Sequence, residues 1–139
     1  MQKILINNHG QMADFAKKQA KNVKNNQIFT LSGTLGSGKT FFAKYFISHL
    51  TGLDVAQITS PTFNIYNHYD ANNLNIYHFD LYRIKDEAEL ENIGFYDLLK
   101  DGVCLIEWPE IAKKYLPRNV VSIIFEIINN NKRKLIITN

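Results

Sequence analysis

One segment of the sequence has residue types and spacing that are typical of phosphate binding. Residues 33–40, Gly-Thr-Leu-Gly-Ser-Gly-Lys-Thr, satisfy the pattern G-x-x-x-x-G-K-[ST]. Glycines at this spacing let successive main-chain N–H groups turn inward and form an anion-binding nest at the positive end of a following helix. The lysine would reach the terminal phosphates, and the last hydroxyl would bind Mg²⁺. The segment therefore predicts that the chain binds a nucleoside triphosphate.

Every position of this segment is a candidate contact for the nucleotide. The expected contacts come from Gly33, Thr34, Leu35, Gly36, Ser37, Gly38, Lys39 and Thr40. A glycine-rich turn without a ligand is the main alternative, but so long a match between a strand and a helix disfavours it. A dinucleotide-binding turn would need the spacing G-x-G-x-x-G, and it would leave Lys39 without a role.

Two acidic residues follow apolar or aromatic stretches and are candidates for the metal. Asp80 ends LNIYHFD, and Glu107 ends VCLIE. Sites of this class take a carboxylate from the end of a neighbouring strand for Mg²⁺, together with the hydroxyl that Thr40 would supply. An acid at a strand end is also commonly a solvated terminus or a helix cap. If both acids act, one would hold the metal and the other would orient the attacking water, and the sequence does not assign the two roles.

Hydroxyl groups also follow the expected phosphate-binding helix. Ser60 and Thr62 lie in the segment TSPTF, at the place where switch elements of nucleotide-binding proteins respond to the γ-phosphate. An ordinary proline turn with a local hydrogen bond explains the segment equally well.

Three further residues have plainer interpretations. Arg83 could stabilise phosphate charge, although a salt bridge is the commoner role of such a residue. We expect His78 to be a packing or surface residue of its strand. We expect Trp108 to lie in the core.

The elements that must position these residues follow from apolar spacing. The loop needs a buried strand before it, at 28–31, and an amphipathic helix after it, ending near Gly52. Alternating stretches separated by polar turns predict two hairpins, one over 64–69 and 74–79 and one over 119–128 and 133–138. The other expected elements are strands at 4–6 and 103–107 and helices at 11–23, 87–92, 96–99 and 110–116.

Length and composition are consistent with one small α/β or α+β domain over residues 1–139. The chain is 45% hydrophobic and 21% charged, and it holds no apolar stretch of about 20 residues as a membrane span requires. The first apolar run ends at Ile6, too early for a secretory signal, so we expect a cytoplasmic protein. The single cysteine, Cys104, excludes an intramolecular disulfide. A net charge of +3 permits contact with nucleic acid but does not require it.

Missing motifs narrow the nucleotide chemistry. No N/T-K-x-D pattern is present to recognise guanine, which disfavours a GTPase, and three scattered arginines make a poor lid for a small-molecule kinase. No H-E-x-x-H zinc motif occurs. An ATPase, a small-molecule kinase and a nucleotide-gated binding module are the three functions that we compare.

Several motifs in a fixed order resemble those of one family. The order GTLGSGKT, SPTF, YHFDLYR, LENIGFYD and LIEWPE, between about residues 28 and 117, resembles the TsaE (YjeE) ATPases, which support threonylcarbamoyladenosine (t6A) synthesis at position 37 of bacterial tRNA. The resemblance implies a three-layer P-loop NTPase domain whose mixed sheet has a parallel core and antiparallel hairpins. It also implies ATP and Mg²⁺ as ligands, and slow hydrolysis that is stimulated by the proteins TsaB and TsaD. TsaD would perform the transfer, and tRNA would be reached through that complex.

The resemblance also implies roles for individual residues. Lys39 and Thr40 match the phosphate and Mg²⁺ residues of the loop, and Thr62 matches the threonine of the switch-like SPT element. Asp80 matches the acidic residue of HxDxYR, near the metal, and Glu107 matches the glutamate of IEW, near the metal and the γ-phosphate. The implied catalytic residues are therefore Lys39, Thr62 and Glu107, and the implied metal residues are Thr40, Asp80 and Glu107.

Overall fold

The computed structural model describes residues 1–61 and 63–139, and across these residues seven strands form one mixed sheet. The strands lie in the order β1-β7-β6-β2-β5-β4-β3. Their bounds are Gln2–Ile6 (β1), Ile28–Gly33 (β2), Tyr66–Ala71 (β3), Leu74–Asp80 (β4), Val103–Glu107 (β5), Val121–Ile127 (β6) and Arg133–Thr138 (β7). The strands β6, β2, β5 and β4 pair in parallel, while β3 and β7 pair antiparallel with β4 and β6. The predicted mixed sheet is confirmed.

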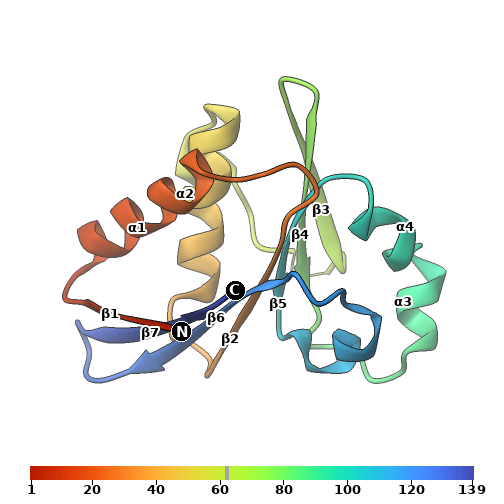
Figure 1. Cartoon of the computed structure of the whole chain (residues 1–139). Coiled ribbons are helices and arrows are strands. Elements are labelled where there is room, and N and C mark those ends of the chain that lie inside the picture. The colour runs from red at the N-terminus through yellow and green to blue at the C-terminus, as the bar shows by residue number, and fades with distance from the viewer. Residues whose placement is uncertain (62) are drawn as a thin grey trace.

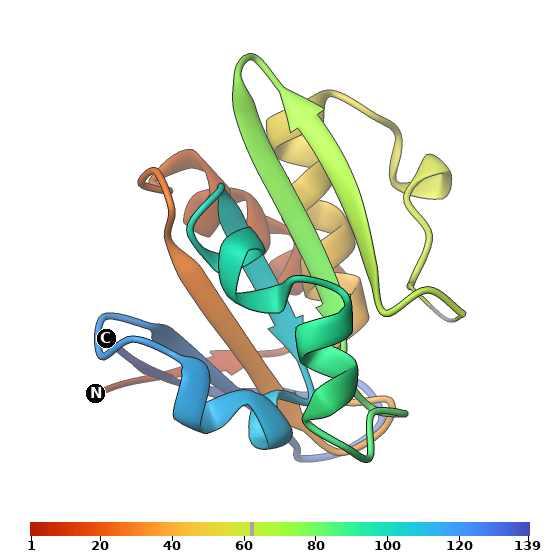
Figure 2. The same ribbon diagram turned by 90° about the vertical axis from the view of Figure 1, so that its right-hand side faces the viewer.

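Helices cover both faces of this sheet and give three layers. One face carries α1 (His9–Lys21) and α2 (Lys39–Thr51), on the left in Figure 1. The other carries α3 (Ala88–Asn92), α4 (Phe95–Leu99) and the 3₁₀ segment η2 (Pro109–Tyr115), which face the viewer in Figure 2. A short 3₁₀ turn, η1 (Val55–Gln57), follows α2. The two termini lie side by side because β1 pairs antiparallel with β7 (Figures 1 and 2).

The central strand β5 shows why the sheet is covered on both sides. All five of its residues are buried, and successive side chains of a strand point to opposite faces. Val103 and Leu105 pack in the core cluster beneath α1 and α2. Cys104 and Ile106 pack in the cluster beneath α3 and α4. Because β5 is packed on both faces, its position in the sheet is fixed. The position of Glu107, its last residue, is therefore fixed as well.

Two helices differ from the pattern that apolar spacing predicts. The helix α1 begins at His9 instead of Gln11, because the Asn8 side chain accepts the Gln11 N–H at 2.8 Å and caps the helix. The segment expected as a helix at 110–116 is the 3₁₀ helix η2. It begins at Pro109 and ends before Pro117, and the greater rise per residue of a 3₁₀ helix lets a few residues span that stretch.

The β3–β4 hairpin confirms the predicted pairing and shows a tighter turn. Ala71 pairs with Leu74, so only Asn72 and Asn73 form the loop. Both have positive φ, 50° and 68°, which fits the two-residue type I′ turn that asparagine tolerates. The hairpin places the end of β4, with Asp80, beside the end of β5.

Among the described residues, no helix is long and apolar enough to cross a membrane.

Candidate functional site

The predicted phosphate loop connects the end of β2 to the start of α2, as the sequence pattern requires. Gly33 is the last residue of β2, and a Cβ there would lie 2.6 Å from both the Phe125 carbonyl oxygen and the Ser37 hydroxyl. Gly38 caps α2 with φ 111°, a left-handed conformation that side chains disfavour. Only glycine fits at these two positions, so the loop curls tightly around the N-terminus of α2.

Lys39, the first residue of α2, lies inside the curl of the loop. Its side chain is 4% exposed, and Nζ donates to the main-chain oxygens of Gly33 at 2.6 Å and Thr34 at 3.0 Å. The ammonium also lies 4.1 Å from the centre of the Trp108 ring. Burial lowers the pKa of Lys39 from its usual value, and the Glu107 carboxylate acts in the opposite direction. The cation is held where it would meet phosphate oxygens.

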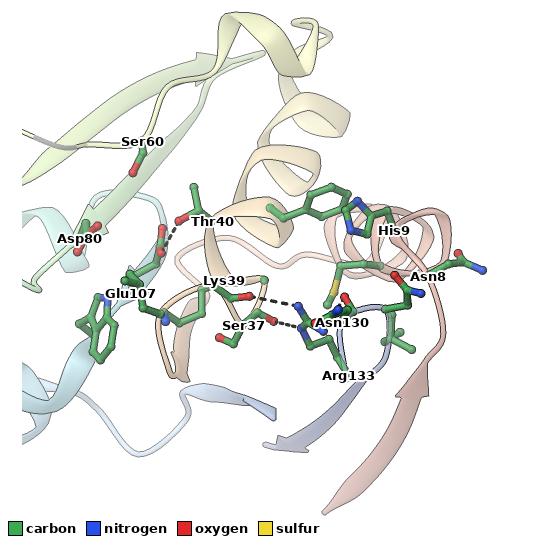
Figure 3. Close-up of a pocket in the computed structure, with 18 residues that line it drawn as sticks. Asn8, His9, Ser37, Lys39, Thr40, Ser60, Asp80, Glu107, Asn130 and Arg133 are labelled. Carbon is green, nitrogen blue, oxygen red and sulfur yellow. Dashed lines mark hydrogen bonds between the residues drawn. The ribbon is translucent and has the colours of Figure 1, made fainter. Parts of the chain in front are cut away.

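Glu107 forms the centre of a buried hydrogen-bond chain on the other side of the site. Its side chain is 2% exposed, and Oε1 accepts the Thr40 hydroxyl at 2.7 Å (Figure 3). Its other oxygen, Oε2, lies 2.6 Å from His78 Nε2. The two predicted metal residues Thr40 and Glu107 are therefore in direct contact, although 67 positions separate them.

Asp80 lies next to Glu107 across the parallel pair β4–β5. Its Oδ1 accepts the Tyr82 N–H at 3.0 Å, and its side chain lines the same cavity as Glu107. Burial is the largest effect on its pKa, which is raised above the usual value, and the nearby Glu107 carboxylate acts in the same direction. The structure therefore brings all three predicted metal residues to one end of one cavity.

The cavity has a volume of about 440 Å³ and extends from the carboxylates past the loop to the N-terminus of α1. At the carboxylate end, Ser60 contributes to the lining, and Thr62 lies outside the described residues. At the far end, polar and aromatic side chains gather between α1, α2 and the β6–β7 turn (Figure 3). These are Asn8, His9, Phe41, Asn130, Asn131 and Arg133.

Arg133, at the start of β7, is a site residue that the sequence did not reveal. Its guanidinium donates to the main-chain oxygens of Ser37 at 3.1 Å and Gly36 at 3.2 Å (Figure 3). It also donates to the main-chain oxygen of Asn129 at 2.7 Å. It therefore ties the phosphate loop to the β6–β7 turn. No motif joins residues 96 positions apart, and only the rarity of arginine in this chain was available as a signal.

Three sequence expectations about side chains need correction or refinement. His78 is not merely a packing or surface residue, because it contacts Glu107. Trp108 is only partly buried, packs against the cluster beneath α3 and α4, and lines the cavity. It takes a left-handed φ of 56°, which turns the chain sharply after Glu107. Arg83 does not line the cavity and lies 5.7 Å from the Phe63 ring.

The donor set suits a small, hard cation that keeps part of its water shell. Within residues 1–61 and 63–139, no three His, Cys, Asp or Glu side chains are grouped to hold a metal. Mg²⁺ does not need such a group, because it binds through one or two protein oxygens together with water and phosphate oxygens. The Thr40 hydroxyl and the Glu107 carboxylate, 2.7 Å apart beside the loop, are oxygen donors of this kind.

The fold and the loop together define a nucleotide-binding P-loop NTPase, and a solved structure agrees. A crystal structure of Bacillus subtilis YdiB matches with a TM-score of 0.73 and 30% identity, covering 96% of this chain and 82% of that one.

A family model described as "Threonylcarbamoyl adenosine biosynthesis protein TsaE" matches residues 6–135, so the chain belongs to the TsaE family. It is 43% identical over 128 residues to the tRNA threonylcarbamoyladenosine biosynthesis protein TsaE of Rickettsia typhi, covering 92% of this chain and 88% of the relative. The TsaE of Bacillus subtilis is 36% identical over 125 residues, covering 88% and 76%.

Proposed function

We propose that the protein binds ATP with Mg²⁺ in this cavity and hydrolyses it slowly, as an accessory to a TsaB–TsaD complex that forms t6A at position 37 of tRNA. The observation that carries this proposal is the hydrogen bond between Thr40 and Glu107, 2.7 Å long, beside a complete phosphate loop. It joins the hydroxyl and the carboxylate that P-loop enzymes use around their metal. Membership of the TsaE family supports the link to tRNA modification.

Binding would rest on the loop and on Lys39. The ammonium bonds two main-chain oxygens of the loop, and these bonds must be exchanged for phosphate oxygens when ATP binds. The exchange is favourable because a charge-assisted bond to phosphate is stronger than one to a neutral carbonyl. The N-terminus of α2 adds its positive dipole end at the same place.

The metal would be held by the hydroxyl of Thr40 and the carboxylate of Glu107, with Asp80 at the next strand end. Bound Mg²⁺ supplies neutralisation of the charge on the phosphate oxygens. The geometry favours Glu107 over Asp80 for the metal, since Glu107 accepts the Thr40 hydroxyl whereas Asp80 accepts the Tyr82 N–H.

Asp80 would then orient the attacking water. The water oxygen would form a bond to the γ-phosphorus while the bond from that phosphorus to the oxygen bridging to the β-phosphate breaks, so that ADP leaves. The Asp80 carboxylate would accept the proton of the water. A carboxylate whose pKa burial has raised is a better proton acceptor than an ordinary one. Thr62 stays a proposed catalytic residue on the resemblance of the SPT element alone.

The partner proteins would carry out the transfer to tRNA. Within the described residues, the phosphate loop and the carboxylates of Asp80 and Glu107 line the same cavity. The modest charge of +3 favours contact with tRNA through the complex over direct binding.

The test is phosphate release from ATP by the purified protein, alone and with TsaB and TsaD. We expect slow release that rises when both partners are added and that needs Mg²⁺. Phosphate transfer to a metabolite without any partner would instead show a kinase. Tight ATP binding without phosphate release, even with both partners, would show a nucleotide-gated binding module.

A further inference from the structure

We propose that His78 is a positioning residue that holds the Glu107 carboxylate in its working orientation. The proposal rests on the function proposed above, and it adds a residue outside the implied catalytic and metal set. The two side chains come from adjacent parallel strands, β4 and β5, where His78 pairs with Leu105 two positions before Glu107.

The contact is short and excluded from water. His78 is 0% exposed and Glu107 is 2% exposed, and Nε2 lies 2.6 Å from Oε2. Both oxygens of the carboxylate are therefore engaged, Oε2 by His78 and Oε1 by the Thr40 hydroxyl. A glutamate held at both oxygens has lost the rotation about its last bonds that a free carboxylate keeps.

The surroundings assign the proton of the ring. Nδ1 is buried and has no hydrogen-bond partner among the described residues. A hydrogen on Nδ1 would leave a buried donor unsatisfied, and a lone pair on Nε2 would face the lone pairs of Oε2. The hydrogen therefore lies on Nε2, which donates to Glu107.

A donor at this position has a specific consequence for the site. Without it, Oε2 would be a buried carboxylate oxygen with no partner, and the carboxylate would turn to recover one. Such a turn would carry Oε1 away from Thr40. The loop and Lys39 do not contact His78 in any hydrogen bond of the structure's described residues, so phosphate binding should persist.

The decisive comparison is between two replacements of the same residue. In His78→Leu the donor is lost and an apolar side chain fills the space, whereas in His78→Gln an amide N–H is available at a similar reach. We expect Leu to lower kcat about tenfold or more, as loss of a residue that orients a site ligand does. We expect Gln to recover most of kcat, and the Kd for ATP without Mg²⁺ to stay within about threefold of wild type in both.

His68→Leu is the matched control. His68 lies on the neighbouring strand β3, and its Nε2 is 2.8 Å from the side-chain oxygen of Asn75 on β4, but it does not line the nucleotide cavity. This variant should keep the wild-type kcat. In a Glu107→Ala background, His78→Leu should cause no further loss, because the partner that it positions is gone.

A kcat for His78→Leu equal to wild type would overturn the proposal, and so would a His78→Gln variant that is as slow as His78→Leu. An NMR measurement keeps the test independent of hydrolysis. In the wild-type protein the His78 Nε2 proton should resonate far downfield, and the signal should be lost in Glu107→Ala. If the wild type fails to hydrolyse ATP but shows this signal, the proposed function is wrong and the contact stands; absence of the signal in a folded wild type removes the contact itself.

Discussion

The phosphate loop and the carboxylate end of the cavity differ in the chemical groups that form them. The loop is eight consecutive residues that offer main-chain groups, and its shape depends on glycines at Gly33 and Gly38. The carboxylate end is assembled from side chains on three separate elements, namely Thr40 on α2, His78 and Asp80 on β4, and Glu107 on β5. Main-chain contacts define the first region, and side-chain hydrogen bonds define the second.

This difference separates two steps of the proposed reaction. The loop contacts the phosphates in any bound state, so damage there should weaken binding. The carboxylate end contacts the metal and the attacking water, so damage there should slow turnover and leave binding nearly unchanged. The effect of each variant of the nucleotide site is therefore expressed in two quantities, the Kd for ATP and kcat.

Glu107→Gln should have the largest effect. It keeps the shape of the side chain but removes the charge that the metal needs, so we expect kcat to fall by about 10³-fold while the Kd for ATP without Mg²⁺ changes little. Phosphate release and calorimetric titration measure the two quantities. Glu110→Gln, an exposed acid three positions later, is the control. An unchanged kcat would remove Glu107 from the mechanism.

Lys39→Ala should weaken the binding of ATP. The ammonium contributes about 3 kcal/mol through charge-assisted bonds, so its loss should weaken ATP binding by about 100-fold. Titration of ATP into the variant measures this. Lys44→Ala, on the same helix and outside the cavity lining, should bind as the wild type does. Full affinity in Lys39→Ala would contradict the assignment of the loop.

Arg133→Met should weaken ATP binding less than Lys39→Ala does. The apolar stem of arginine is retained, but the bonds to Ser37 and Gly36 are lost and the loop is less well ordered before ATP arrives. We expect the Kd to rise by about tenfold with kcat at saturation little changed. In Lys134→Met the neighbouring residue, which pairs with Glu126, is altered instead, and binding should not change. A loss of kcat without a change in Kd in Arg133→Met would contradict the assignment of binding to the loop and of turnover to the carboxylate end.

The smallest effect concerns the strand beneath the carboxylates. Burial raises the pKa of the Cys104 thiol from 9.0 to about 12. The unfolded chain therefore releases this proton first, so the stability that the protonated thiol contributes is complete below pH 9 and is lost as the pH rises toward 12. At pH 9.5 the loss is about 0.8 kcal/mol. Urea titrations at several pH values give the free energy of unfolding of the wild type and of Cys104→Ala. Above pH 9 this free energy should fall more steeply with pH in the wild type than in the variant. The same pH dependence in both proteins would show that the thiol does not titrate on unfolding.

The phosphate loop could be predicted from the sequence more completely than the carboxylate end, because its residues are consecutive whereas those of the carboxylate end come from separate elements. A loop made of consecutive residues is a motif, so positions 33–40 were readily predicted, as were the strands that end in Asp80 and Glu107. The contact of His78 with Glu107 depends on the register of β4 on β5, which no local pattern specifies. The bonds of Arg133 depend on the order of strands across the sheet, which brings β7 next to the loop only through β6.

The most direct test is a crystal structure of the protein with Mg²⁺ and a non-hydrolysable ATP analogue. We predict that Lys39 Nζ leaves the oxygens of Gly33 and Thr34 for the β- and γ-phosphates, and that the Thr40 hydroxyl turns from Glu107 to the metal. His78 should keep its bond to Glu107 throughout. An analogue bound elsewhere, with the bonds of Lys39 and Thr40 intact, would contradict the assignment of this cavity to nucleotide hydrolysis.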